Sequence, residues 1–223
     1  MCYNTAKRTE LISKSDRSRN MDENGTKNSE LDGQIAEWCS QMLEYRIPRW
    51  SELPEIELYM DQVIALMEKY LGVFYDEENK TITPSMINNY VKLGLIPAPV
   101  KKKYSKIHLA YILIICILKQ VIPINAITRM IEHQMSRHSI EEAYDLFCEE
   151  QEKAFLGAVK KARELNGPSN EIMVEDFILR STIAANSEKA VSGKLTAIID
   201  RINNAAKEEK EKEKDKPKEK EGK

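Results

Sequence analysis

Apolar residues recur three and four positions apart through almost the whole of this chain, and that spacing restricts it to a helical fold. The first such stretch places five apolar residues on one helix face: Leu31, Ile35, Trp38, Met42 and Tyr45. Pro48 then ends the pattern. Only the segment 95–104, which contains Pro97 and Pro99, looks extended. We therefore expect an all-α protein.

Proline and glycine mark where the next helices begin and end. Pro54 suits a first helical position and predicts a helix over residues 55–71. Thr83 followed by Pro84 is a favourable pair for a helix start, and Gly94 is a favourable left-handed residue for a helix end. These three residues predict a short helix between them.

The most apolar stretch, IHLAYILIICIL, covers residues 107–118. It follows Ser105, which predicts a helix from there to about Gln120. A helix needs ~20 apolar residues to span a bilayer. This stretch is shorter, so we expect a buried helix and no membrane span.

Three more helical segments follow. Pro123 begins one of them, and Ser139 with Glu142 forms the capping-box signature of a long helix over residues 139–165. Residues 170–204 predict either a single last helix or a broken pair.

The domain organisation follows from these patterns and from the polar ends of the chain. We expect a disordered N-terminus at residues 1–28 and a helical domain over 29–135. A helical dimerisation or effector region would cover 136–204. Residues 205–223 balance lysines against acids, which predicts a disordered charged tail or a frayed helical extension.

Charge is unevenly distributed along the chain. Residues 79–131 contain eight basic residues and no Asp or Glu, where the average acid frequency of the chain would give about nine. The segment carries +8 and the rest of the chain −10, for a total of −2. Such a local positive field is what a phosphate-backbone ligand requires. Burial explains the missing acids in 107–118, but it does not explain the cluster Lys101–Lys103.

The predicted short helix has an apolar and a polar face. Its inner face holds Ile87, Tyr90, Val91 and Leu95. Its outer face holds Ser85, Asn88, Asn89 and Lys92. Adjacent asparagines lower helix propensity, but an Asn amide can pair bidentately with adenine, and flanking Ser and Lys side chains can hold phosphates. The alternative is that both asparagines are ordinary polar surface.

The order of these elements resembles that of MerR-type regulators. The resemblance lies in Thr83-Pro84-Ser85, in Tyr90-x-Lys92-Leu93-Gly94-Leu95-Ile96-Pro97, and in the basic segment ending at Tyr104-Ser105 before an apolar helix. It implies a winged helix-turn-helix with a recognition helix at Pro84–Leu93 and a wing at Pro97–Tyr104. The interval before the recognition helix, about eleven residues, is longer than the tight turn of that family.

A second resemblance covers roughly residues 33–155. The segment Pro54–Gln62, the phrase INNYVK, Lys102-Lys103-Tyr104 and Tyr144-Asp145-x-Phe147 are similar to a bacterial family known as domain of unknown function eighteen thirty-six. That resemblance implies MerR-like, winged-helix transcription regulators with no known effector.

The expected function is sequence-specific binding of double-stranded DNA by a cytoplasmic homodimer that regulates transcription. Ten residues are the expected DNA contacts: Ser85, Asn88, Asn89, Tyr90, Lys92, Lys101, Lys102, Lys103, Tyr104 and Lys106.

Other chemistry finds little support in the sequence. Three histidines and four cysteines show no zinc-ligand spacing, and the cysteines fit reduced thiols. No phosphate-binding glycine loop or catalytic constellation occurs, so we expect neither an enzyme nor a cofactor. The main alternative is a helical protein–protein adaptor whose basic face binds an acidic partner.

Overall fold

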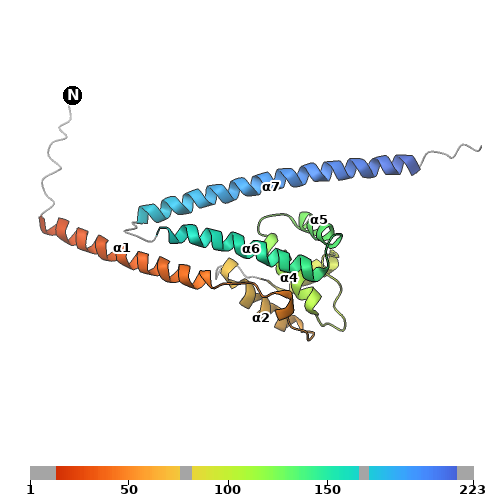
Figure 1. The fold of residues 1–223 in the computed structure, drawn as a ribbon, viewed down its shortest axis with the longest axis horizontal. Coiled ribbons are helices and arrows are strands. Elements are labelled where there is room, and N and C mark those ends of the chain that lie inside the picture. Colours follow the sequence, from red (N-terminus) through yellow and green to blue (C-terminus); the bar gives the residue numbers. More distant parts are fainter. Residues whose placement is uncertain (1–13, 76–81, 166–170, 215–223) are drawn as a thin grey trace, which may run out of the picture. The chain divides into compact units, whose positions relative to one another are not determined.

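A computed structural model describes residues 14–75, 82–165 and 171–214 (Figure 1). Over these ranges the chain forms seven α-helices and two short 3-10 turns. The α-helices are α1 (Lys14–Leu43), α2 (Met60–Leu71), α3 (Pro84–Lys92), α4 (Lys106–Leu118), α5 (Ile124–Met135), α6 (Ile140–Arg163) and α7 (Glu171–Lys214). The described ranges hold no β-strand, only two isolated antiparallel bridges. The all-α prediction is confirmed.

The chain divides into two compact units. One consists of residues 48–148 with 182–223, and the other of residues 1–47 with 149–181. The division runs through α6 and lies after residue 148, whereas the sequence suggested a boundary at residue 136. The reason is that the first part of α6 belongs to the core of the larger unit. Tyr144 is fully buried there, and its hydroxyl donates a 2.8 Å hydrogen bond to the carbonyl of Pro48.

Helix α4 forms the centre of the larger unit. Nine of its thirteen residues are buried, as expected for so apolar a sequence. Helices α2 and α5 pack against α4, and α3 packs against α2. The hydroxyl of Tyr75 adds a 2.8 Å hydrogen bond to the carbonyl of Cys116.

The segment before α2 differs from the expectation. Helix α2 begins at Met60, so the prediction of a helix from Pro54 is wrong. The cause is a β-bridge, because Leu58 and Tyr104 exchange backbone hydrogen bonds of 2.9 and 2.8 Å. The side chain of Gln62 then accepts a 2.9 Å bond from the Tyr59 N–H and caps the helix start.

The smaller unit contains α1, the second half of α6 and the first residues of α7. The rings of Tyr45 and Phe155 meet edge to face at 5.5 Å. Helix α1 begins at Lys14 and so includes residues 14–28 of the segment for which disorder was expected. No proline interrupts this stretch, and its Lys, Arg, Glu and Met residues are compatible with a helix. Residues 1–13 lie outside the described residues.

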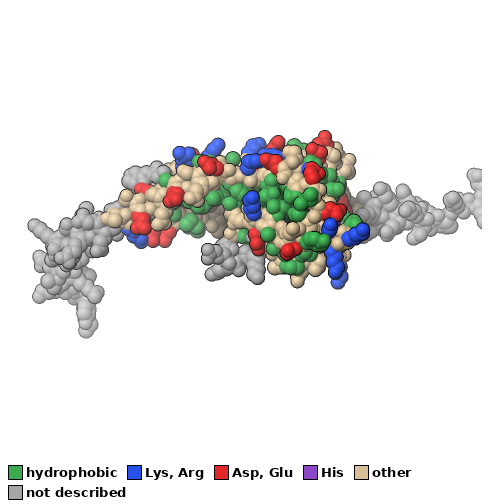
Figure 2. Space-filling model, turned by 90° about the horizontal axis from the view of Figure 1, so that it is seen from below, with side chains coloured by type: hydrophobic (Ala, Val, Ile, Leu, Met, Phe, Trp, Pro, Cys, Tyr) green, Lys and Arg blue, Asp and Glu red, His purple; other side chains and the backbone are tan. Residues whose placement is uncertain are grey.

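Helix α7 is one continuous helix of 44 residues rather than a broken pair. It extends to Lys214, so the first ten residues of the expected disordered tail are helical, and the rest lie outside the described residues. Large apolar side chains along α7 are exposed, among them Leu195 and Ile202. Hydrophobic side chains also lie at the surface among charged ones on the face drawn in Figure 2. Within the described ranges, no helix combines the length and the apolar character that crossing a membrane requires.

Candidate nucleic-acid interface

Helix α3 is defined at both ends by its own sequence. The side chain of Thr83 accepts a 3.3 Å hydrogen bond from the Met86 N–H, and Pro84 occupies the first turn. At the other end Gly94 has φ +71°, and the Leu95 N–H donates to the carbonyl of Tyr90 at 2.9 Å. This is a Schellman motif. The predicted start and end of the helix are confirmed.

The two faces of α3 are also as expected. On the inner face Ile87, Tyr90 and Leu95 are buried, and Val91 is half-buried. The outer face is exposed at all four of its positions: Ser85, Asn88, Asn89 and Lys92. None of these four side chains has a hydrogen bond or ion pair with another described residue. The outer face therefore presents two amides, a hydroxyl and an ammonium group to solvent.

A tight turn follows at residues 100–103. Val100 and Lys103 form an antiparallel bridge, with the Lys103 N–H donating to the carbonyl of Val100 at 2.9 Å. The two central residues, Lys101 and Lys102, have φ of 50° and 63°. Positive φ at both positions is characteristic of a type I′ turn, which favours Asn-Gly. A non-glycine residue in this conformation costs on the order of 1 kcal/mol. The turn thus carries two exposed lysines at positions where the backbone favours other residues.

Two of the expected DNA contacts are buried. Tyr90 and Tyr104 each have 3% of their surface exposed. Burial, with smaller contributions from Cys116 and Tyr75, raises the pKa of Tyr90 far above its usual value. The ring of Tyr104 packs edge to face against His108 at 5.5 Å. Rings this buried offer almost no surface to a ligand, so neither tyrosine is exposed as a DNA contact would have to be.

Lys106 is committed to contacts within the protein. Its side chain is only 12% exposed, forms an ion pair with Glu55, and lies over the ring of Trp50 at 5.1 Å. Lys106 is therefore not a free cation that could neutralise a DNA phosphate. Lys103 is half-buried, with its ammonium group 5.5 Å from the centre of the Tyr59 ring.

The remaining basic residues of the acid-free segment lie elsewhere. Lys119 approaches the sulfur of Met86 at 3.6 Å, and Arg129 forms an ion pair with Asp200 at 2.8 Å. Lys80 lies outside the described residues. The exposed positive charge of the segment therefore comes from three lysines, Lys92, Lys101 and Lys102. The half-buried Lys103 contributes in part.

Sequence reasoning missed the acids that the fold brings alongside this segment. The bridge between Leu58 and Tyr104 joins the acid-free segment to a stretch that contains Glu55 and Glu57. Both carboxylates are exposed, and Glu55 neutralises Lys106. Only the pairing of the two segments reveals these neighbours, since Glu55 and Lys106 are 51 residues apart.

The thiols in the described part of the chain are buried. Cys39, Cys116 and Cys148 are inaccessible to solvent, and burial raises the pKa of Cys116 to about 12 despite the nearby Lys119. A thiol with such a pKa stays protonated at neutral pH and is a poor nucleophile. No metal-binding cluster of His, Cys, Asp or Glu occurs among the residues that the structure covers.

Comparison with known proteins finds a family model that matches part of the chain. Neither the curated proteins nor the solved structures include a match to the chain. Residues 48–147, which coincide with the continuous part of the larger unit, match the model of a family described as Domain of unknown function (DUF1836).

Proposed function

We propose that the chain is a sequence-specific DNA-binding transcription regulator of the MerR-like, winged helix-turn-helix type. The exposed outer face of α3 carries this proposal, because it offers two asparagine amides, between Ser85 and Lys92, that pair with no other described residue. Helix α3 would enter the major groove. The turn at residues 100–103 would act as the wing.

The chemistry of these side chains suits the two kinds of contact that DNA recognition needs. The amide of Asn88 or Asn89 can accept from N6 and donate to N7 of adenine, which reads sequence. Lys92, Lys101 and Lys102 can neutralise phosphates, which gives affinity without sequence information. The strained conformation of Lys101 and Lys102 supports a role for these lysines, since a turn selected for stability alone would favour Asn-Gly.

Selection of genomic fragments by the purified full chain tests the proposal. Bound fragments should share a common sequence, and affinity for that sequence should fall steeply between low and high salt. The absence of any enriched sequence, together with an affinity that salt does not change, would overturn it.

The proposed regulator acts as a homodimer on an inverted repeat. Two-fold symmetric proteins of this kind read two half-sites. The exposed apolar residues of α7 support self-association, since large apolar patches on a soluble protein commonly mark an interface.

A helical adaptor that binds another protein is the second candidate. The same exposed residues of α7 favour it, with the lysines of the α3 region meeting an acidic partner. Measurements on DNA distinguish the two candidates. An adaptor should bind DNA weakly and without sequence preference, whereas the regulator should prefer its selected sequence by several orders of magnitude.

A further inference from the structure

Helices α5 and α7 line a partly open pocket within the larger unit. Its volume is about 350 Å³, which lies in the range of small-molecule sites. Both polar and apolar side chains line it: Arg129, Met130 and His133 from α5, with Thr196, Ile199 and Asn203 from α7. The lining therefore combines one guanidinium group with hydrogen-bonding groups and an apolar surface.

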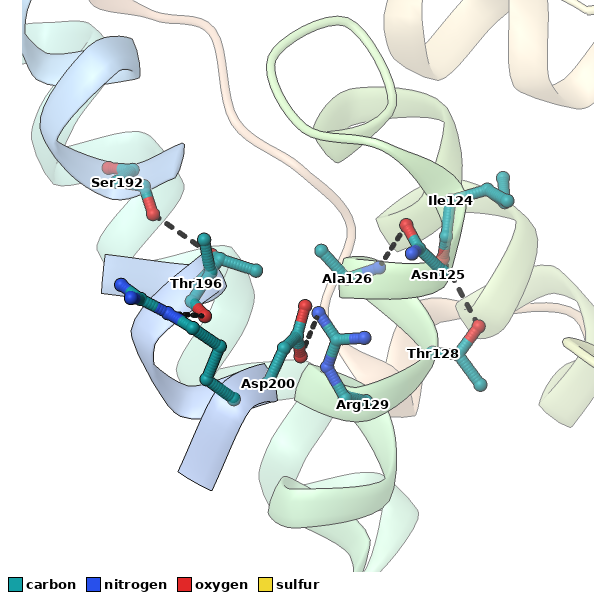
Figure 3. A network of polar contacts seen from close by, with 10 residues as sticks. Ile124, Asn125, Ala126, Thr128, Arg129, Ser192, Thr196 and Asp200 are labelled. Atoms are coloured by element: carbon teal, nitrogen blue, oxygen red, sulfur yellow. Dashed lines mark hydrogen bonds and ion pairs between the residues drawn. The ribbon is translucent and has the colours of Figure 1, made fainter. Parts of the chain in front are cut away.

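The guanidinium group of Arg129 is incompletely satisfied. Its Nη2 atom lies 2.8 Å from Oδ1 of Asp200 on α7 (Figure 3). The two charges are close, yet this buried N–H donor forms no well-aligned hydrogen bond with any described residue. Arg129 presents five donors in a planar fork, but the ion pair joins only one of its nitrogens to one oxygen of Asp200. A carboxylate bound bidentately would satisfy it better.

We propose that this pocket binds a small organic carboxylate with a short alkyl chain. The carboxylate would bind Arg129 in place of Asp200, and the side-chain amide of Asn203 can donate a further hydrogen bond. The alkyl chain would lie against Met130 and Ile199. A dianion such as phosphate fits less well, because Arg129 is the one arginine in the lining and the lining contains no lysine.

Binding would change how α7 is held. Between residues 182 and 205 every α7 side chain is exposed except Thr196 and Asp200, which are half-buried. The ion pair with Arg129 is therefore a main attachment of this part of α7. A ligand that displaces Asp200 would favour a state in which α7 is less tightly held, as any ligand favours the state it binds better.

Methyl NMR of the full chain, labelled at Met and Ile methyl groups, tests the proposal with hexanoate as the probe. Hexanamide, which has the same shape without the charge, is the matched control. Hexanoate should shift the methyl signals of Met130 and Ile199 in a saturable way. Hexanamide should bind at least about tenfold more weakly, and the buried Met67 should not respond.

Three variants connect the response to the ion pair. Arg129→Gln should abolish hexanoate binding, whereas Arg201→Gln, which removes the same charge from an exposed position on α7, should not change it. Asp200→Asn should strengthen hexanoate binding, because the competing carboxylate is gone. A damaged fold could not produce that gain. Equal binding of hexanoate and hexanamide, no saturable shift, or unchanged binding by Arg129→Gln would overturn the proposal. None of these outcomes depends on DNA binding.

Discussion

At the scale of single residues, the two asparagines of α3 are the most informative feature of the surface. A solvent-facing helix position favours Glu, Lys, Arg or Ala over Asn by several tenths of a kcal/mol. Asn88 and Asn89 are exposed and have no hydrogen-bond partner among the described residues, so no contact within the protein compensates this loss. A ligand outside the chain would compensate it, and base edges suit the amide group.

Replacement of Asn88 by Ala tests that interpretation directly. Asn88→Ala should weaken binding to the selected DNA sequence by about 1–3 kcal/mol and leave binding to random DNA nearly unchanged. Thermal stability should hold or rise slightly, because the side chain is exposed and Ala is the better helix former. Affinities for both DNAs and a thermal melt measure this. Equal losses on the two DNAs would reassign Asn88 to a backbone contact.

Replacing Lys101 and Lys102 should remove two positive charges without damaging the fold. The double change Lys101→Asn with Lys102→Gly supplies the preferred type I′ pair, so stability should stay the same or increase. Binding to every DNA sequence should weaken alike. The slope of log affinity against log salt should flatten by roughly two units, because each lysine would neutralise one phosphate.

The control for this pair removes two lysines elsewhere. Lys160 and Lys161 are exposed on α6, and their replacement by Asn removes the same net charge. That variant should keep the salt slope of the original chain. An equal flattening in both variants would mean that only the overall charge matters, contrary to a wing at residues 100–103.

At the scale of elements, the helices predicted well are those whose signals are local. Thr83, Pro84 and Gly94 delimit α3 within a dozen residues, and Ser139 with Glu142 forms the predicted capping box at 2.9–3.2 Å. The faces of α3 follow from the same local period, so the outer face could be predicted too.

The elements and contacts predicted badly depend on residues far apart in the sequence. The start of α2 is set by the bridge of Leu58 to Tyr104, which no local pattern indicates. Lys106 looked like a free cation until the fold placed Glu55 and Trp50 around it. Charge patterning along the chain therefore predicted more positive surface than the folded protein presents.

The contact between α6 and the segment at Pro48 gives a stability prediction at this scale. Tyr144→Phe removes a buried hydroxyl and leaves the carbonyl of Pro48 without that donor, which should cost about 1–2 kcal/mol of unfolding free energy. The exposed Tyr59, changed to Phe, should cost almost nothing. Urea denaturation of both variants compares them. Equal stability of the two would show that the Tyr144 hydroxyl contributes no net stability.

At the scale of the whole molecule, α6 and α7 each contribute residues to both compact units. The region after residue 136 is therefore shared between the two units and does not form a unit of its own. Truncation before α6 would remove Tyr144 from the core of the larger unit, and a resulting monomer would say nothing about the interface. Self-association has to be tested by substitutions on the surface of the intact chain.

The exposed apolar residues of α7 indicate where such surface substitutions should be made. Leu195 and Ile202 are 56% and 63% exposed, and seven residues apart on a helix places them on the same face. Replacing both with Gln removes apolar surface from that face without adding charge. If this face pairs two copies of the chain, the variant should sediment as a monomer. It should also bind a single half-site and the full inverted repeat with similar affinity, because the gain from linking two half-sites is lost.

The matched control places Gln at Ala190 and Ala197, which are exposed on the other side of α7. That variant should remain a dimer, since it adds the same amides away from the interface. A dimer in both variants would assign self-association to another surface. A monomer in both variants of a dimeric parent would show that the effect is not specific to this face, and a monomeric unmodified chain would rule out a stable homodimer.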